Sequence, residues 1–376
     1  LVGSEMCIRD RFNTENEDNM EKEKKSKIKK ILVNLTIFIL LIILTFSLVL
    51  KDQDVSQIFS VAAKVKKQYI LFAVLAMSIY ILGEAVNITR ILKELGEKSK
   101  LISNIRYTLI GFFFSAITPA ASGGQPMEIY YMHKDDISVA NSTLALLMQL
   151  CSLQIVTITV GTISAVIHFE VLKSGLIYLL ILGIILNSSA LMLLIIAIFS
   201  KKLSEGLIKF AVKLLKFFRI PNVEKKQEKL EKELESYQTS AKYIKEHKIL
   251  MLKTVITTVV QMIAYYSVPY WIYLAFGLTE YNIFEILTLQ AVLYATVSGI
   301  PSPGAVGVSE GGFLGIFKNV FPETIISSAM LLTRGANFYL FIIISAIIVM
   351  ISTFREKRIE KKQMQETEVL TEKSEK

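Results

Sequence analysis

Long uncharged stretches of mostly apolar residues recur along this chain and alternate with short blocks rich in charged residues. An apolar helix of about 20 residues crosses the ~30 Å hydrocarbon core of a bilayer, so such stretches predict membrane-spanning helices. Eight can be read from the sequence, at 31–50, 68–83, 107–127, 137–167, 174–200, 254–279, 286–309 and 335–354. The pattern therefore predicts an all-α integral membrane protein.

Two of these stretches, 107–127 and 286–309, contain clustered helix-breaking residues. The breakers are Pro119, Gly123, Gly124 and Pro126 in the first stretch, and Pro301, Pro303 and Gly304 in the second. Proline removes a backbone donor and clashes with the preceding turn, and glycine adds backbone freedom, so neither stretch continues as one helix. Unwound backbone at membrane depth is tolerated where protein or a wet cavity surrounds it. Each stretch therefore predicts a re-entrant helix–break–helix hairpin.

The distribution of Lys and Arg favours the same interpretation. Basic residues gather before residue 31, in 90–106, in 201–253 and after residue 354, and such blocks mark the cytoplasmic side of a membrane. All four blocks lie on one side if neither broken stretch crosses the membrane. The first stretch then enters and leaves at the cytoplasmic face, and the second enters and leaves at the outer face. Six full crossings then remain, at 32–50, 69–89, 137–167, 174–200, 250–276 and 324–354. We expect a multi-pass protein of the bacterial cytoplasmic membrane with both termini in the cytoplasm.

The broken stretches also correspond to each other. Pro119 precedes Glu128 by nine residues, Pro301 precedes Glu310 by nine residues, and the offset between the pairs is 182. The predicted repeats are residues 20–173 and 174–354. Each contains three crossings and one hairpin, and an odd number of crossings inverts the second copy. Inverted repeats with discontinuous helices are a transporter architecture.

Three further segments are predicted outside the spans. Residues 1–19 begin LVGSEMCIRDR, which is similar to adapter-derived sequence at the ends of gene models, so we expect an artefactual or disordered extension before a natural start at Met20. The loop 201–249 predicts an amphipathic helix in the cytoplasmic interface and then a charged helix. That second helix is interpreted as a connector on the membrane surface or as a partner-binding coiled coil. The charged tail 355–376 is expected in the cytoplasm.

Composition excludes some classes of function. The 376 residues carry a net charge of +9, but the basic residues flank the apolar stretches and suit anionic lipid, so no nucleic-acid partner is expected. Two cysteines and three widely spaced histidines give no disulfide framework or metal signature, and no cofactor is expected.

Ionisable residues at membrane depth are costly, which makes Arg334 the clearest candidate for a binding residue. Its guanidinium could hold a lipid phosphate bidentately, or it could form a structural pair with Glu310 or another carboxylate. Glu128 and Glu310 could bind a cationic headgroup or a proton, or could cap the half-helices that follow the breaks. We expect Arg334, Glu128 and Glu310 to cluster in one cavity, with Gln125 as a further lining residue.

Other polar and aromatic residues in the spans have less specific interpretations. Gln149, Gln154, Gln261 and Gln290 could line the cavity or join helices to one another. The aromatic residues between Tyr265 and Tyr273 are expected at the outer membrane interface.

The segments TPAASGGQPMEIYYM and GIPSPGAVGVSEGGF resemble the flippase-like transmembrane domain family of lysylphosphatidylglycerol synthases, and the resemblance covers roughly residues 30–355. It implies movement of an aminoacylated phospholipid between leaflets and resistance to cationic peptides. Full-length synthases also carry an acyltransferase domain, whereas 22 residues follow Phe354 here and cannot fold into one.

Three functions remain open at this point. The first is a lipid flippase or transporter with membrane phospholipids as partners, together with a separate aminoacyl-lipid synthase. The second is an enzyme acting on a lipid, such as a phosphatidylglycerol lysyltransferase, with Glu128 or Glu310 as general base. The third is a non-transporting membrane scaffold. The transported lipid, the energy source and the oligomeric state are left open by the sequence.

Overall fold

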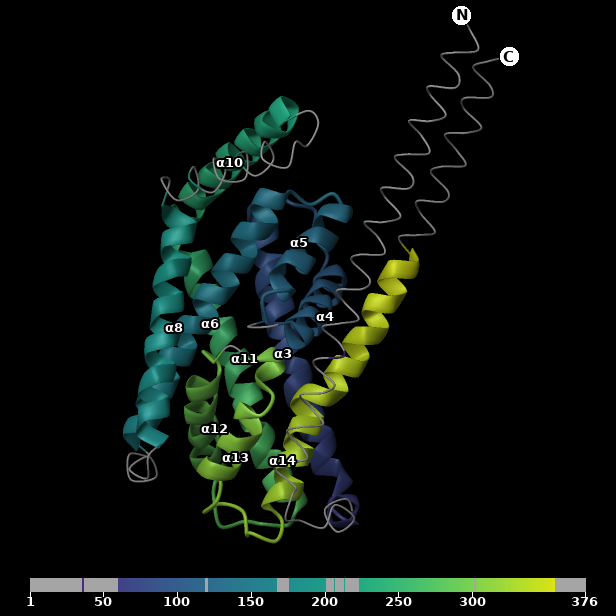
Figure 1. The fold of residues 1–376 in the computed structure, drawn as a ribbon, viewed down its shortest axis with the longest axis vertical. Helices are drawn as coiled ribbons and strands as arrows, with labels where there is room; N and C mark the ends of the chain where they lie inside the picture. The colour runs from purple at the N-terminus through teal and green to yellow at the C-terminus, as the bar shows by residue number, and fades with distance from the viewer. Residues whose placement is uncertain are drawn as a thin grey trace, which may run out of the picture.

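The computed structural model describes residues 60–118, 121–167, 176–200, 223–300 and 302–355, together with Thr36, Gly206 and Lys213. The regular structure of these residues is helical throughout (Figure 1). The all-α prediction is therefore confirmed for the part of the chain that is described. The predicted extension 1–19 and most of the tail 355–376 lie outside it, as does the crossing at 32–50 apart from Thr36.

Five long helices form the body of the molecule. They are α3 (Lys67–Glu94), α6 (Val139–Ile167), α8 (Leu176–Phe199), α11 (Lys248–Ala275) and the helix Ile326–Arg355. This last helix comprises α14 (Ile326–Arg334), the π-helical turn η3 (Gly335–Tyr339) and a regular helix beyond it. All five are long and apolar enough to cross a membrane. They correspond to five of the six predicted crossings.

The outer faces of these helices are apolar. On α8, for example, Ile185, Met192 and Leu193 are each more than half exposed. An apolar patch this extensive is unusual on a soluble protein and is expected of a surface that contacts lipid tails. The structure is therefore that of a multi-pass membrane protein.

The first broken stretch folds into two packed antiparallel helices, α4 (Leu101–Ile117) and α5 (Gly124–Lys134). At their outer ends, the Arg106 guanidinium and the Tyr107 hydroxyl both donate to the Asp135 carboxylate. Near the break, Gly124 lies so close to Ser115 that a Cβ added to the glycine would be 2.0 Å from the serine Oγ. Both outer ends of this hairpin therefore lie at the same end of the bundle.

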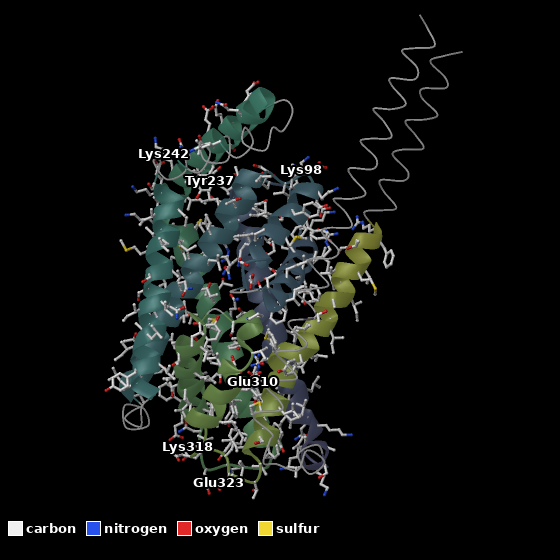
Figure 2. The ribbon with its side chains drawn as sticks, in the orientation of Figure 1. Lys98, Tyr237, Lys242, Glu310, Lys318 and Glu323 are labelled. Atoms are coloured by element: carbon white, nitrogen blue, oxygen red, sulfur yellow. The ribbon has the colours of Figure 1, made fainter. Side chains whose placement is uncertain are left out.

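The second broken stretch repeats this arrangement with α12 (Ile283–Val297), the 3₁₀ turn η2 (Pro303–Ala305) and α13 (Val308–Ile316). The Tyr281 hydroxyl, before α12, donates to the Asn319 carbonyl, after α13, over 3.0 Å. Lys98 and Lys318, which flank the first and second hairpins respectively, lie at opposite ends of the molecule (Figure 2). The two hairpins therefore open toward opposite ends.

The breaks themselves differ in detail from the prediction. Gly124 and Pro126 lie in the first turn of α5, where proline is tolerated because its missing N–H has no intrahelical partner, so they are not part of the break. Gly123 is the N-cap residue, and Ala121 adopts a φ of 54°. In the second hairpin, Pro303 and Gly304 do lie in the turn, and Gly304 has a φ of 59°. Pro119 and Pro301 lie outside the described residues.

The charged segment after residue 222 is a helix, α10 (Val223–Glu246), as predicted. It packs on α6 and α8 through Ala241 and Ile244, which are buried, and the Tyr237 hydroxyl donates to the Ala197 carbonyl over 3.0 Å. Of the predicted amphipathic helix at 201–218, the structure describes Gly206 and Lys213.

Candidate functional site

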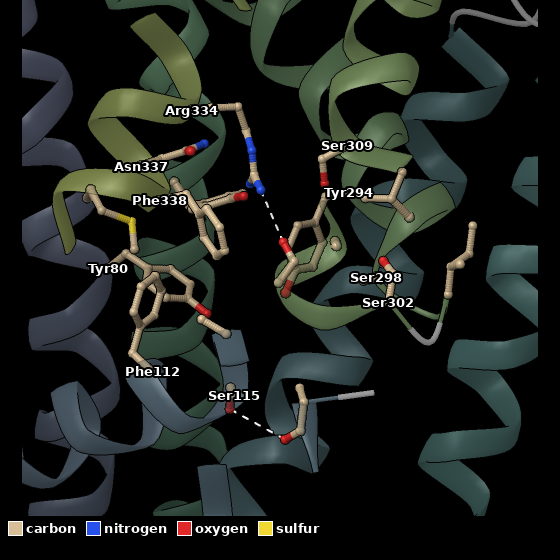
Figure 3. A pocket seen from close by; sticks show the side chains of 18 of the residues that line it. Tyr80, Phe112, Ser115, Tyr294, Ser298, Ser302, Ser309, Arg334, Asn337 and Phe338 are labelled. Carbon is tan, nitrogen blue, oxygen red and sulfur yellow. Dashed lines mark hydrogen bonds between the residues drawn. The ribbon is translucent and has the colours of Figure 1, made fainter. Parts of the chain in front are cut away.

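A cavity of about 300 Å³ lies where the two hairpins meet. Phe112, Ser115 and Ala121 line it from the first hairpin, and Ser298, Ser302 and Gly304 line it from the second. The walls are completed by Tyr80 of α3, Tyr265 of α11, Tyr294 of α12, and Arg334, Asn337 and Phe338 of the last long helix (Figure 3). The predicted meeting of the two breaks is thus present in the structure.

Arg334 points into this cavity between Phe338 and Ser309 (Figure 3). Its Nε donates to Glu310 Oε1 over 2.8 Å and its Nη2 donates to the Gly304 carbonyl over 3.1 Å. The guanidinium carbon lies 4.0 Å from the centroid of the Phe338 ring, so the ring supports it as well. These two hydrogen bonds use two of the five guanidinium N–H groups.

Glu310 holds Arg334 in this position and is itself fully buried. Its Oε1 accepts from Arg334 and, over 3.1 Å, from the Tyr339 hydroxyl. Its Oε2 accepts from the N–H of Gly307, the N-cap residue of α13, over 2.7 Å. The structure therefore contains both the ion pair and the helix cap that the sequence left as alternatives to ligand binding.

Arg334 sits at a local irregularity of its helix. The five residues that follow it form the π-helical turn η3, and Asn337, Phe338 and Tyr339 all belong to this turn. A π-helical turn is rare and often occurs at functional sites, because the extra residue redirects neighbouring side chains. Here Asn337 and Phe338 line the cavity, while Tyr339 bonds Glu310.

Glu128 lies in a different place from Glu310. It is 3% exposed, does not line the cavity, and its Oε2 is buried with no hydrogen-bond partner among the described residues. A Cβ on Gly111 of α4 would be 2.0 Å from Glu128 Oε1, and Glu84 of α3 is the neighbouring charge. The structure brings Arg334 and Glu310 together but does not place Glu128 with them, and Glu128 caps no helix.

The difference between the two glutamates has a geometric cause. Glu310 is the third residue of α13, from which its side chain reaches the N-cap N–H. Glu128 is the fifth residue of α5, because that helix begins at Gly124, two residues earlier than the 182-residue offset requires. The carboxylate of Glu128 therefore points along the helix side toward α4.

The glutamines act mainly between helices. The Asn87 amide donates to Gln149 Oε1 over 2.8 Å and to the Thr258 hydroxyl over 3.0 Å, and the Gln149 amide donates to Gln261 Oε1 over 3.2 Å. This network joins α3, α6 and α11, which confirms the interhelical interpretation for Gln149 and Gln261. Gln125 is half-buried and is not among the residues that line the cavity.

The prediction that the aromatic residues between Tyr265 and Tyr273 lie at the outer membrane interface is wrong for several of them. Tyr266 and Tyr273 are buried in the bundle, and Tyr265 lines the cavity together with Tyr80 and Tyr294. These cavity tyrosines are functional candidates that sequence reasoning missed, because a tyrosine in an apolar stretch has the same signature at an interface and in a core. The rings of Tyr265 and Tyr294 are 5.3 Å apart and that of Tyr80 is 5.2 Å from Tyr265.

Comparison with known families covers most of the described residues. A family model described as the lysylphosphatidylglycerol synthase TM region matches residues 31–345. The chain belongs to this family. A comparison with curated proteins finds no match. For this member of the lysylphosphatidylglycerol synthase TM family, the match includes both hairpins, Glu310 and Arg334, so the cavity lies within the region that defines the family.

Proposed function

We propose that the protein moves a phospholipid between the two leaflets of the bacterial cytoplasmic membrane, with Arg334 binding the phosphate of the headgroup. The observation that carries this proposal is the position of Arg334, buried at 6% exposure yet lining a cavity between the two hairpin breaks. Its planar guanidinium, with several N–H donors, matches the oxygens of a phosphodiester. Membership of the lysylphosphatidylglycerol synthase TM family supports a phospholipid or an aminoacylated phospholipid as the cargo.

In this proposal Glu310 is a positioning residue. All of its hydrogen bonds are made within the protein and the side chain has no exposed surface, so it orients Arg334 and neutralises its charge when the site is empty. A neutral pair lowers the cost of keeping a guanidinium at membrane depth. The hydroxyl groups of Tyr80, Ser302 and Ser309 supply further hydrogen-bonding groups for a headgroup.

We also propose a membrane arrangement. The hairpins would be re-entrant from opposite faces and both termini would be cytoplasmic, while the predicted crossing at 32–50 lies outside the described residues apart from Thr36. Helices broken near the middle of the membrane and arranged in two inverted halves support alternating exposure of a central site. The cavity of about 300 Å³ accommodates a headgroup, while the acyl chains remain among the apolar helix faces.

The test is reconstitution of the purified full-length protein in liposomes containing a trace of tail-labelled phospholipid. Chemical quenching of the outer leaflet then measures the rate at which labelled lipid crosses. Phosphatidylglycerol, lysylphosphatidylglycerol and phosphatidylethanolamine are compared, since their headgroups are anionic, cationic and zwitterionic. The proposal predicts faster exchange than in protein-free liposomes for at least one of the three. Equal rates with and without protein for all three would contradict it.

A further inference from the structure

A second hollow, away from the hairpin junction, lies at the end of the bundle where α4 begins and the last long helix ends. It has a volume of about 210 Å³ and is lined by Lys98, Lys100, Arg106, Asp135 and Arg355, among others. Four basic side chains and one carboxylate give it a formal charge of +3. Lys98 lies at the same end of the molecule as α10, far from Glu310 (Figure 2).

The positive charge of this hollow is poorly compensated. Asp135 is bonded by Arg106 and by the Tyr107 hydroxyl, which accounts for the one carboxylate. Lys98, Lys100 and Arg355 form no ion pair within the described part of the chain. The Nε of Arg106 is buried and has no hydrogen-bond acceptor there either. Like charges held this close repel, so the arrangement favours a bound anion.

An apolar groove continues directly from the basic hollow. It has a volume of about 280 Å³, shares Ser103, Arg106 and Arg355 with the hollow, and is otherwise lined by Ile102, Ile105, Leu109 and Ile348. From Ile102 to Leu109 a helix advances about 10 Å at 1.5 Å per residue, so the groove runs along α4 away from the basic end. Ile102 is 71% exposed at its mouth.

The order of these two surfaces matches a phospholipid in a membrane. The basic hollow lies where the helices end, which is the level of the headgroups, and the groove follows the helices toward the hydrocarbon core. A soluble anion would leave the apolar groove empty, and a lipid without an anionic headgroup would leave the positive charges of the hollow uncompensated. Basic pockets between helices at this level are typical sites for anionic lipid headgroups.

We infer that this end of the protein binds one anionic glycerophospholipid, with the phosphate on Lys98, Lys100, Arg106 and Arg355 and an acyl chain in the groove between α4 and the last long helix. This site is separate from the cavity that contains Arg334. Lipid binding at this site does not require transport activity, because it follows from the charge and shape of this end of the molecule alone.

The test is the thermal unfolding midpoint of the full-length protein in neutral detergent, titrated with a short-chain phosphatidylglycerol. The same titration is made with short-chain phosphatidylcholine and with glycerol phosphate, which separate the lipid charge from the lipid chain. We expect a saturable rise in the midpoint with phosphatidylglycerol and no rise with the other two. No rise with phosphatidylglycerol, or an equal rise with glycerol phosphate, would overturn the inference.

Two sets of variants localise the effect. The combination Lys98→Gln, Lys100→Gln and Arg355→Gln should weaken the apparent affinity about ten-fold or more, as expected when charge-assisted contacts are lost. The matched control is Lys242→Gln, Lys245→Gln and Lys248→Gln, which removes the same charge from exposed positions on α10 and at the start of α11. Equal weakening by the control would show non-specific attraction and overturn the inference.

A third variant separates this site from the central cavity. With Arg334→Gln and Glu310→Gln combined, phosphatidylglycerol should still give a saturable rise in the midpoint, because both residues are outside the hollow and the groove. Loss of the rise in this variant would assign the binding to the central cavity and overturn the inference. Failure of the lipid-exchange assay in liposomes would leave the result of this titration unchanged.

Discussion

Arg334 and Glu310 are 24 residues apart in the chain and belong to different helices, yet Arg334 Nε donates to Glu310 Oε1 over 2.8 Å in a site that is almost fully buried. This pair fastens the second hairpin break to the last long helix beside the cavity. Burying an ion pair costs desolvation that the mutual attraction only partly offsets, so pairs of this kind are often kept for a reason other than stability.

The first prediction concerns the stability of this pair. Arg334→Gln leaves the Glu310 carboxylate buried without its cation, and Glu310→Gln leaves Arg334 without its anion. Breaking a buried pair from one side costs about 3–5 kcal/mol, whereas replacing both charges is close to neutral. Thermal unfolding in detergent should therefore show large losses for each single variant and a much smaller loss for the double variant. A double variant as unstable as the sum of the singles would contradict this account of the pair.

Gly304 provides a test of the break geometry. Its φ of 59° is in the left-handed region, and a Cβ there would be 2.2 Å from Cζ of Phe338. Gly304→Ala should therefore destabilise the protein by about 1–3 kcal/mol and disturb the ring that supports Arg334. The matched control is Gly311→Ala in α13, where an added Cβ meets nothing within 4 Å and alanine suits a helix better than glycine. Equal effects of the two substitutions on the unfolding midpoint would show that the break is not as described.

The paths of the hairpins can be tested by cysteine labelling from the two sides of the membrane. In a background of Cys7→Ser and Cys151→Ser, single cysteines replace Lys98 and His133, which flank the first hairpin. Another pair replaces Glu280 and Lys318, which flank the second, and all four positions are exposed. Each pair should label from one side, and the two pairs should label from opposite sides. Labelling of Lys98→Cys and His133→Cys from different sides would mean that the first hairpin crosses the membrane.

Substitution of Glu128 is expected to change the stability of the protein in the opposite direction from substitution of Glu310. The side chain of Glu128 is buried and its Oε2 has no partner within the described residues. Glu128→Gln replaces this carboxyl by a neutral side chain of nearly the same shape, so the unfolding midpoint at pH 8 should rise. Glu246→Gln on the exposed face of α10 is the control and should stay within about 0.5 kcal/mol of the wild type. A marked fall in the midpoint for Glu128→Gln would show that its carboxylate has a stabilising partner.

The all-α class and five of the six crossings could be predicted from the sequence because these signals are local. Charge-free runs indicate the spans, and clustered proline and glycine indicate which apolar stretches are interrupted, whatever the helices pack against. Of the two glutamates that the Pro-to-Glu spacing picked out, Glu310 bonds the cavity residue Arg334, whereas Glu128 does not line the cavity. The exact start of α5 depends on how Gly124 packs against Ser115, and that close contact is not visible in the sequence.

Side-chain partners were harder to predict because they depend on helix rotation. Nothing in the order of residues shows that Arg334 faces Glu310 while Glu128 faces Gly111, since both glutamates follow their breaks at equal spacing. The tyrosines were misplaced for the same reason. A π-helical turn after Arg334 shifts the register of the side chains beyond it, and single-sequence patterns carry no sign of such a turn.

The most direct test of the central claim is lipid exchange in liposomes by the double variant Arg334→Gln and Glu310→Gln, measured beside the wild type. This variant removes the proposed phosphate-binding cation while keeping a neutral, hydrogen-bonding pair, and its unfolding midpoint is measured to check that the fold is intact. We expect exchange to fall by about ten-fold or more, since a charge-assisted hydrogen bond contributes about 1.5–3 kcal/mol. Exchange at the wild-type rate by the folded double variant would contradict the assignment of Arg334 as the headgroup-binding residue.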